Sequence, residues 1–375
     1  MTSNNKMKKI TLIIIFGFQL IFANGQSHVR KAYEDITYSV VYLEREIIEQ
    51  THYNDSIYQV WLKPLNKDTM LPKLIRYTGT GFLTYYEDFL FLITAQHVAE
   101  KMTFDSKIYF SNKNNKPYVI KLGDLINYEP ASWTFNNESD LAIIMISPTD
   151  EYLDSLRIKY IPQSVILKQR ESPSRDTKLT IIGFPLGLGI QDIFSPITKT
   201  TYPASDLIKL KNPVTKKLNT YFLLSDPSTS GFSGAPVFKM PVTQFEKNKI
   251  YTIVGVTLHG LISATISDET GGKFAAVVPS YLIFESLKNA RKFSVKFIYK
   301  YKNGNPWSEV IYKNGKPWTV IYNFDSIGKP QKKGTLKNGN GTLYIYDEKS
   351  NLISIMKIKT GEIISVEDIS SQLKI

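Results

Sequence analysis

The chain between residues 38 and 279 is patterned in short runs of apolar, aromatic and β-branched residues, separated by turn-forming segments. Such runs, bounded by Gly, Pro, Asn, Asp and Ser, are typical of β-strands. The predicted strands are Tyr38 to Leu43, Ile57 to Leu62, Phe82 to Thr94 with a hairpin turn at 85–88, Leu141 to Ile146, Leu179 to Phe184, Tyr221 to Leu224, Val237 to Phe238, Tyr251 to Leu258 and Lys273 to Val278. This regular spacing favours an all-β fold of barrels or sandwiches.

The pattern changes after residue 279. Apolar residues recur at near-helical intervals from Ser280 to Arg291, which predicts one helix there. Beyond it, the segment YKNGNPW at 301–307 recurs eleven residues later as YKNGKPW at 312–318, with a looser copy at 336–341. Asn-Gly pairs flanked by strand residues indicate tight hairpin turns. We therefore expect a C-terminal region of β-hairpin repeats that bury one face by stacking.

The amino-acid composition limits which disulfide and metal sites the chain could form. The 375 residues include 42% hydrophobic and 21% charged residues, which is ordinary for a globular protein of two or three domains. The chain contains no cysteine, so disulfides and thiolate metal sites are excluded. Its four histidines make a zinc cluster difficult to build. We expect neither a metal nor a cofactor.

The N-terminus resembles a signal peptide. Lys6, Lys8 and Lys9 precede a mostly apolar run from Ile10 to Phe22, and small residues follow at 23 and 25. The run is shorter than the ~20 residues needed to span a bilayer. It therefore predicts cleavage after residue 25, a secreted or periplasmic location and no transmembrane span in the mature chain; a retained membrane anchor is the alternative.

The positive charge is concentrated near the C-terminus. The whole chain has a formal net charge of +12, and residues 291–360 hold 14 Lys/Arg and 4 Asp/Glu, a net of +10. This stretch is either a solvated basic surface or a site for an anionic partner such as a cell-surface polymer. Nucleic-acid binding is not expected, because the chain carries an export signal and no nucleic-acid motif.

Three segments carry candidate chemistry. His97 follows the apolar run 89–93, so its side chain is expected just past a strand end. Asp140 directly precedes the apolar strand at 141–146, and Glu138 is a nearby competitor. A buried carboxylate can fix the tautomer of an imidazole and stabilise its protonated form. His97 and Asp140 are therefore a candidate base and orienting acid, although each residue alone could be purely structural.

Ser233 is the candidate nucleophile. It lies in the turn Gly231-Phe232-Ser233-Gly234, where small residues let backbone N–H groups converge. The N–H groups of Gly231 and Ser233 are candidate donors for an oxyanion hole, a device in which each donor contributes about 10²–10³ in turnover. With His97 and Asp140, these are the parts required for peptide hydrolysis by a serine nucleophile.

These segments resemble the catalytic boxes of chymotrypsin-like (trypsin-like) serine peptidases of bacterial type. TAQHV, DLAII and GFSGAP resemble the three boxes, GTGF at 79–82 resembles the preceding strand, and GFPLG at 183–187 and VGVTLHG at 254–260 resemble segments of the second barrel. The resemblance implies a chymotrypsin-like double β-barrel. It also implies that His97 is the base, Asp140 its orienter and Ser233 the nucleophile. The YxNGK segments similarly resemble MORN-type repeats.

The resemblance also implies a substrate pocket near Ser228, Thr257 and His259. The position six residues before the nucleophile, where trypsin carries an aspartate, is Pro227, which argues against a preference for Arg or Lys. Phe232 stands where zymogen-activated members carry an aspartate. A preference for Glu, read by His259, is one alternative, and simple packing of His259 against the barrel is the other.

The expected organisation is a signal peptide at 1–25, a first β-barrel at 33–150, a second β-barrel with a terminal helix at 151–291 and MORN-like β-hairpin repeats at 296–363. The expected function is a secreted serine endopeptidase with polypeptide substrates. The alternative is a non-catalytic barrel protein that binds a cell surface through its basic aromatic repeats. An intact set of His97, Asp140 and Ser233 favours the enzyme.

Overall fold

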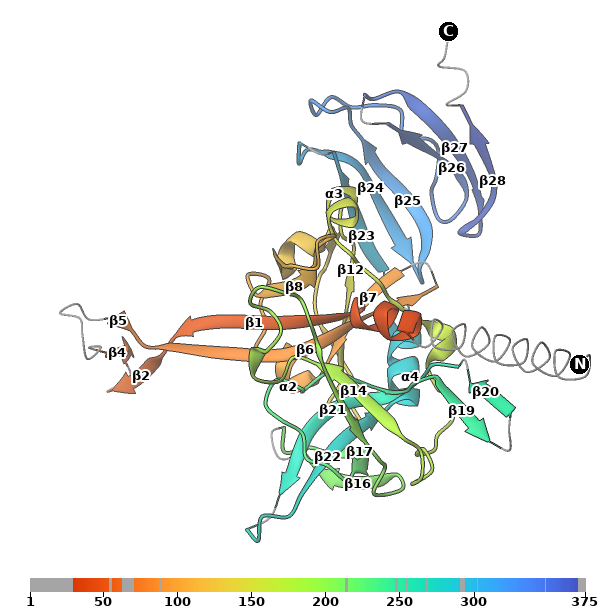
Figure 1. The fold of residues 1–375 in the computed structure, drawn as a ribbon. Helices are drawn as coiled ribbons and strands as arrows, with labels where there is room; N and C mark the ends of the chain where they lie inside the picture. The colour runs from red at the N-terminus through yellow and green to blue at the C-terminus, as the bar shows by residue number, and fades with distance from the viewer. Residues whose placement is uncertain are drawn as a thin grey trace, which may run out of the picture.

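The protein is mostly β, as the strand pattern predicted (Figure 1). The structure is a computed structural model that describes residues 30–369 except 54–55, 63–70, 88, 213–214, 247–248, 254, 268, 291–293, 302 and 348. The predicted signal peptide at 1–25 lies outside the described residues. Within the described residues, no helix has the length and apolar character needed to cross a membrane.

The first sheet has eight strands in the order β11-β12-β7-β6-β1-β8-β9, with β13 pairing in parallel with β6. These strands are β1 (Val40–Ile48), β6 (Leu74–Tyr86), β7 (Phe89–Thr94), β8 (Lys107–Ser111), β9 (Pro117–Lys121), β11 (Thr134–Phe135), β12 (Ala142–Ile146) and β13 (Ile161–Pro162). The predicted hairpin at 85–88 is present, because Tyr86 pairs with Phe89 across the turn. Strands β7 and β12, which flank the candidate residues His97 and Asp140, are neighbours in this sheet.

The second sheet has seven strands in the order β15-β14-β18-β21-β22-β17-β16. Its strands are β14 (Leu179–Gly183), β15 (Ile197–Thr201), β16 (Ile208–Lys211), β17 (Leu218–Leu224), β18 (Pro236–Lys239), β21 (Thr257–Ser267) and β22 (Lys273–Pro279). Among the described strands, the hydrogen-bonded order of each of these two sheets is an open path and does not close into a barrel.

Two predicted strands are wrong. Ile57 to Leu62 is interrupted at Val60, because its two parts, β3 (Ser56–Gln59) and β4 (Trp61–Leu62), belong to separate hairpins. Tyr251 to Leu258 was expected to be continuous, but β20 (Lys249–Ile253) ends before β21 begins at Thr257. The reason is pairing: β20 forms a separate hairpin with β19 (Val242–Glu246), whereas β21 pairs with β18 and β22. A stretch rich in β-branched residues cannot reveal that its two halves have different partners.

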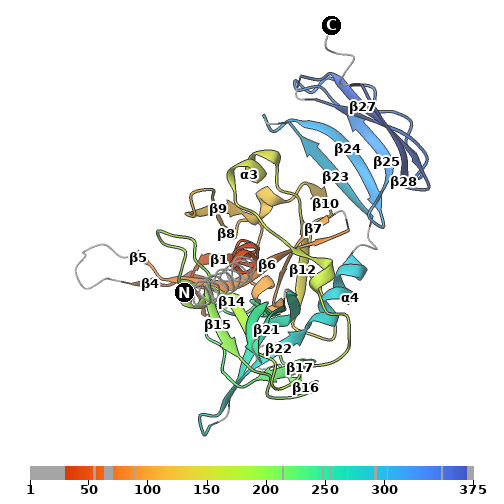
Figure 2. The ribbon, with the colours of Figure 1, turned by 45° about the vertical axis from the view of Figure 1, so that its right-hand side comes forward.

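The helix α4 (Ser280–Ala290) follows β22, close to the predicted range, and the C-terminal strands follow the helix. Three of them form a sheet with the earlier strand β10, in the order β10-β23-β24-β25, and the other three form a sheet in the order β26-β27-β28. These strands are β10 (Tyr128–Glu129), β23 (Ser294–Lys300), β24 (Pro306–Lys313), β25 (Lys316–Asn323), β26 (Gly341–Tyr346), β27 (Leu352–Lys359) and β28 (Glu362–Asp368). Figure 2 shows both sheets to one side of the rest of the molecule.

The Asn-Gly pairs lie at hairpin turns, as expected. Asn314 and Gly315 both have positive φ, at 52° and 75°, and Lys313 pairs with Lys316 across them. Such turns match the twist of the strands they join. The sequence gave no sign of β10, a two-residue strand that pairs with β23 and joins the C-terminal sheet to the segment before Asp140.

The remaining elements are short. They are strands β2 (Gln50–Tyr53), β3 (Ser56–Gln59), β4 (Trp61–Leu62) and β5 (Leu71–Pro72), helices α2 (Gln96–Ala99) and α3 (Asp150–Ser155), and 3₁₀ turns η1 (Leu122–Leu125), η2 (Gln163–Val165) and η3 (Pro185–Gly187). Residues 30–37 are helical.

The largest hydrophobic core extends through both large sheets. One cluster of buried side chains includes Leu83 and Ile93 of the first sheet and Phe238 and Leu261 of the second. Because burial of each such side chain contributes about 1.5–3 kcal/mol, this shared core holds the two sheets together. The residues at their junction are therefore fixed in position.

Candidate active site

His97 lies just beyond the end of β7, on the short helix α2. The last apolar residues of β7, Phe91 to Ile93, are buried in the first sheet, and Ala95 is extended, so the chain leaves the sheet before it turns. The His97 side chain is only 17% exposed. The sequence prediction placed His97 just past a strand end, and the structure places it there.

Asp140 lies between β11 and β12 and is fully buried. One carboxylate oxygen, Oδ1, accepts the backbone N–H of His97 at 3.0 Å, and Oδ2 lies 2.8 Å from His97 Nδ1. A proton on Nδ1 satisfies this contact and leaves Nε2 as a proton acceptor. The competitor Glu138 instead lies on the surface, 3.9 Å from Arg170.

Two further side chains hold the Asp140 carboxylate. The Ser263 hydroxyl donates to Oδ2 at 2.5 Å, and the Asn212 amide lies 3.3 Å from the same oxygen. Burial raises the pKa of Asp140 and is the largest single influence on it, but the hydrogen bonds and electrostatic attraction from His97, together with the hydrogen bond from Ser263, outweigh burial. The pKa of Asp140 therefore lies below its ordinary value, and the carboxylate is charged at neutral pH.

Ser233 lies in the turn before β18. Its hydroxyl donates to the backbone carbonyl oxygen of Ser263 at 3.1 Å. Within the described residues no hydrogen bond joins Ser233 directly to His97. Ser263 therefore contacts both parts of the site, binding Asp140 through its side chain and Ser233 through its backbone.

The turn that carries Ser233 is fastened to the first sheet by Thr80 of β6. The Thr80 N–H donates to the carbonyl oxygen of Ser233 at 2.9 Å, and its hydroxyl donates to that of Gly231 at 2.7 Å. Gly234 has φ +86°, and a Cβ there would lie 2.0 Å from the Thr80 carbonyl oxygen. The same Cβ would lie 2.3 Å from Oγ1 of Thr94, at the end of β7. The backbone of the turn thus packs on both β6 and the strand end that leads to His97, and only glycine fits at 234.

The backbone N–H groups of Gly231 and Ser233 remain available. Among the described residues, neither donates a hydrogen bond to a protein acceptor, whereas Phe232, Gly234 and Ala235 all do. Gly231 has φ +95°, and a Cβ there would lie 2.4 Å from the carbonyl oxygen of Phe184. Buried N–H groups are usually paired. Two unpaired donors beside a serine hydroxyl are therefore suited to donate hydrogen bonds to an oxygen atom of a bound substrate.

Of the three residues predicted to form the substrate pocket, Ser228 lies near this site. Its carbonyl oxygen accepts the hydroxyl of Thr265 at 3.1 Å, and Thr265 is two residues beyond Ser263 on β21. Thr257 and His259 do not lie there. They belong to the start of β21, where Thr257 pairs with Lys239 and His259 is the extra residue of a β-bulge opposite β18. The rise along a strand puts His259 ~13 Å from Ser263.

His259 is also unsuited to recognising an acidic side chain. Burial, followed by the nearby Lys239, lowers the pKa of His259 to about 4, so the imidazole is neutral at pH 7. Its Nε2 is buried without a hydrogen-bond partner. The resemblance took VGVTLHG for the pocket strand, whereas the part of β21 beside Ser233 is residues 263–265.

The sequence reasoning missed Thr80, Asn212 and Ser263. The signal for Ser263 was a serine in the otherwise apolar segment LISAT of a buried strand, where an unpaired hydroxyl would be costly. Asn212 gave no comparable signal, because it lies in a polar loop. Within the described part of the chain, no three His, Asp or Glu side chains gather as metal ligands.

No family model matches the chain, and no curated protein matches it. Among solved structures, a variant of the HtrA-type protease AlgW with a decapeptide is similar, at a TM-score of 0.40 and 14% sequence identity. That likeness covers 72% of this chain and 69% of the protease chain.

Proposed function

We propose that this protein is a serine endopeptidase with a chymotrypsin-like fold, exported from the cell, that hydrolyses polypeptides through Ser233, His97 and Asp140. One observation carries the proposal. The buried Asp140 binds His97 and Ser263 through a single carboxylate, and the carbonyl of Ser263 accepts the hydroxyl of Ser233. All three predicted residues therefore belong to one connected network, although they are far apart in sequence.

In the proposed reaction, the Ser233 hydroxyl turns from the Ser263 carbonyl toward His97 Nε2, a change between staggered rotamers of one side chain. Ser233 Oγ attacks the carbonyl carbon of the scissile peptide as Nε2 takes its proton. The charged Asp140 stabilises the imidazolium that forms. His97 then gives the proton to the departing amine, and a water molecule, activated by the same imidazole, hydrolyses the ester on Ser233.

The oxyanion of the tetrahedral intermediate would be held by the N–H groups of Gly231 and Ser233. Their lack of protein acceptors supports this role, because donors already in place need no reorganisation as charge develops. Thr80 helps to keep these donors in position, since it binds the carbonyl groups of both residues.

A fluorophosphonate probe tests the proposal, because it reacts covalently with activated serine hydroxyls. The wild-type protein should be labelled at Ser233, and Ser233→Ala should not be labelled. Ser230→Ala is the matched control, since Ser230 is an exposed serine in the same turn, and it should be labelled as wild type. Absence of labelling in wild type, or labelling that persists in Ser233→Ala, would remove the proposal.

The alternative, a binding module that uses the basic aromatic repeats, has less support. Trp307 packs on Tyr299 with ring centroids 5.2 Å apart, and the Lys313 ammonium lies over Trp318 at 5.1 Å. Both tryptophans are thus engaged within the C-terminal strands rather than presented as a stacking platform for a glycan. Binding of an anionic polymer by the surface lysines remains a prediction, as does the MORN-type assignment.

A further inference from the structure

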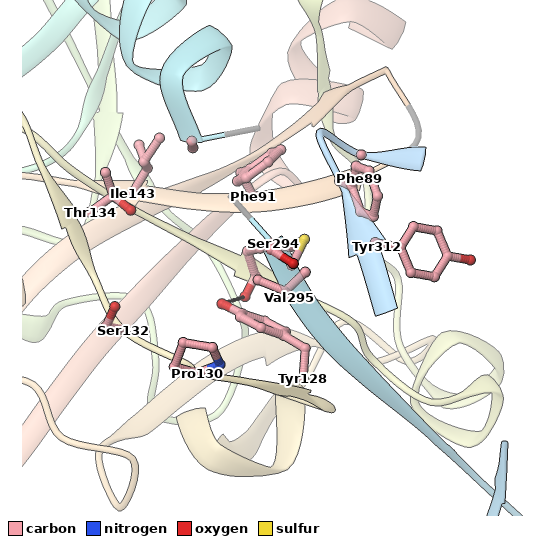
Figure 3. Close-up of a pocket in the computed structure, with 13 residues that line it drawn as sticks. Phe89, Phe91, Tyr128, Pro130, Ser132, Thr134, Ile143, Ser294, Val295 and Tyr312 are labelled. Atoms are coloured by element: carbon pink, nitrogen blue, oxygen red, sulfur yellow. Dashed lines mark hydrogen bonds between the residues drawn. The ribbon is translucent and has the colours of Figure 1, made fainter. Parts of the chain in front are cut away.

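A cavity of about 280 Å³ lies between the first sheet and the C-terminal sheet (Figure 3). The lining comes from β7, β11 and β12 of the first sheet and from β10, β23 and β24 of the C-terminal sheet, with the end of α4, the segment after β10 and the turn after β24. The lining residues are Phe89, Phe91, Tyr128, Pro130, Ser132, Thr134, Ile143, Met145, Ala290, Ser294, Val295, Tyr312 and Gly315. A second hollow of about 570 Å³ shares Phe89, Tyr312 and Gly315, so the two sheets leave this junction incompletely filled.

The walls are apolar and carry no charge. Four of the thirteen lining residues are aromatic, and the lining includes no Asp, Glu, Lys, Arg or His. The Tyr128 hydroxyl is already used, because it donates to the carbonyl oxygen of Met145. The hydroxyls of Ser132, Thr134 and Ser294 make no hydrogen bond to another described residue. A ligand would therefore meet a hydrophobic body of the cavity and a few free hydroxyls.

The volume sets the size of that ligand. A cavity of ~150 Å³ lined by apolar side chains holds benzene, so about twice that volume suits a ligand of roughly ten to fifteen heavy atoms. We propose that this cavity is a binding site for a small neutral amphiphile, with an aromatic or branched aliphatic body and one hydrogen-bonding end. An anion or cation would be excluded, because no wall residue can balance its charge.

The cavity is adjacent to the strands that carry the candidate active site. Thr134 pairs with Ile143 on the two strands that flank Asp140, and Ile143 pairs with Ile93, four residues before His97. A ligand that touches Thr134 and Ile143 would therefore contact the hairpin that positions Asp140. Occupancy should change the reactivity of Ser233, and this second part of the inference rests on the proposed function.

Binding is tested first, in the Ser233→Ala protein, so that the result does not depend on catalysis. The probe is 2-naphthol, which has eleven heavy atoms, one hydroxyl and its own fluorescence. Saturable one-to-one binding with Kd on the order of 100 μM is expected for a ligand of this size in a preformed apolar site. Naphthalene-2-sulfonate, an anion of similar shape, should bind at least ten times more weakly. Absence of saturable 2-naphthol binding, or equal binding of the anion, would overturn the site.

Two variants assign the binding to this cavity. Ser294→Trp places a large side chain at an exposed part of the lining, where folding should tolerate it, and Val295→Trp fills the interior; each should weaken binding at least tenfold. Ser365→Trp is the matched control, because Ser365 is an exposed strand serine that lines neither hollow, and it should bind as its parent does. Unchanged binding in both cavity variants would show that 2-naphthol binds elsewhere.

Coupling to the active site is tested in the protein that retains Ser233. Saturating 2-naphthol should change the rate of fluorophosphonate labelling at least twofold, and Ser294→Trp should abolish that change. An unaltered labelling rate would overturn the coupling while leaving the binding site in place. Absence of any labelling would instead refute the proposed function, and the binding result would stand on its own.

Discussion

Replacing His259 with leucine should remove an acid sensitivity from the fold. Burial and Lys239 lower the pKa of His259 from 6.5 to about 4. In the unfolded chain the imidazole gains a proton as the pH falls below about 6.5, whereas in the folded protein it stays neutral until about pH 4. Protons therefore favour the unfolded state across this range, and the free energy of unfolding falls as the pH is lowered.

The magnitude follows from the two pKa values. Between pH 7 and pH 4.5, the difference in proton binding lowers the free energy of unfolding by about 2 kcal/mol. Leucine carries no proton, so His259→Leu should lack this part of the decline. At pH 7 the substitution should be nearly neutral, because the buried Nε2 has no hydrogen-bond partner to lose.

Urea unfolding at pH 7, 6, 5 and 4.5 measures the effect. The wild-type midpoint should fall faster with acid than that of His259→Leu, and the two curves should separate mainly between pH 6 and 4.5. Equal losses in both proteins would refute the assigned burial of His259. Peptide cleavage at pH 7 gives a second readout, and the substitution should leave the preference for the residue before the scissile bond unchanged. A lost preference for Glu would restore His259 to the substrate pocket.

Four other substitutions give separate tests. Ser263→Ala removes a hydrogen bond to a charged carboxylate and should slow fluorophosphonate labelling about tenfold or more, with KM for a peptide substrate nearly unchanged. Asp140→Asn should lower kcat by about 10⁴, because the amide favours the wrong imidazole tautomer, and the far-ultraviolet circular dichroism should remain that of wild type. Thr80→Val removes the hydroxyl that holds the Gly231 carbonyl and should lower both the labelling rate and the free energy of unfolding, the latter by about 1–3 kcal/mol in urea titrations; retention of both would contradict the role given to this residue. Leu186 has φ +56° and is 69% exposed, so Leu186→Gly should raise the thermal midpoint slightly, by relieving up to about 1 kcal/mol of backbone strain; a lower midpoint would show that its side chain contributes packing.

The sequence pattern correctly predicted the elements whose conformation depends on residues adjacent in the chain. The hairpin at 85–88, the helix after residue 279 and the Asn-Gly turn at 314–315 depend on neighbouring residues, and the structure has all three. The contact between His97 and Asp140 could also be anticipated, because each residue follows or precedes a buried apolar strand and such strands pair in a sheet.

Features that depend on distant partners could not be anticipated. Ser263 acts through a strand register that no local pattern reveals, and the mistaken pocket at Thr257 and His259 arose from the same uncertainty. The two-residue strand β10 has no sequence signal of its own, because it is a strand only through its pairing with β23. Pairing across long separations is decided by the assembled core and not by the residues of one segment.

The position of Thr80 has a consequence for the order of events during synthesis. This residue belongs to β6, near the start of the chain, yet it binds the carbonyl groups of Gly231 and Ser233, more than 150 residues later. A nascent chain that has folded only its first sheet therefore holds an imidazole and a carboxylate but no nucleophile, and the serine turn gains its anchor only when the second sheet docks. Under the proposed function, hydrolytic activity would arise only after the second sheet has folded and docked, which would protect the first sheet, while it is still alone, from attack by its own active site.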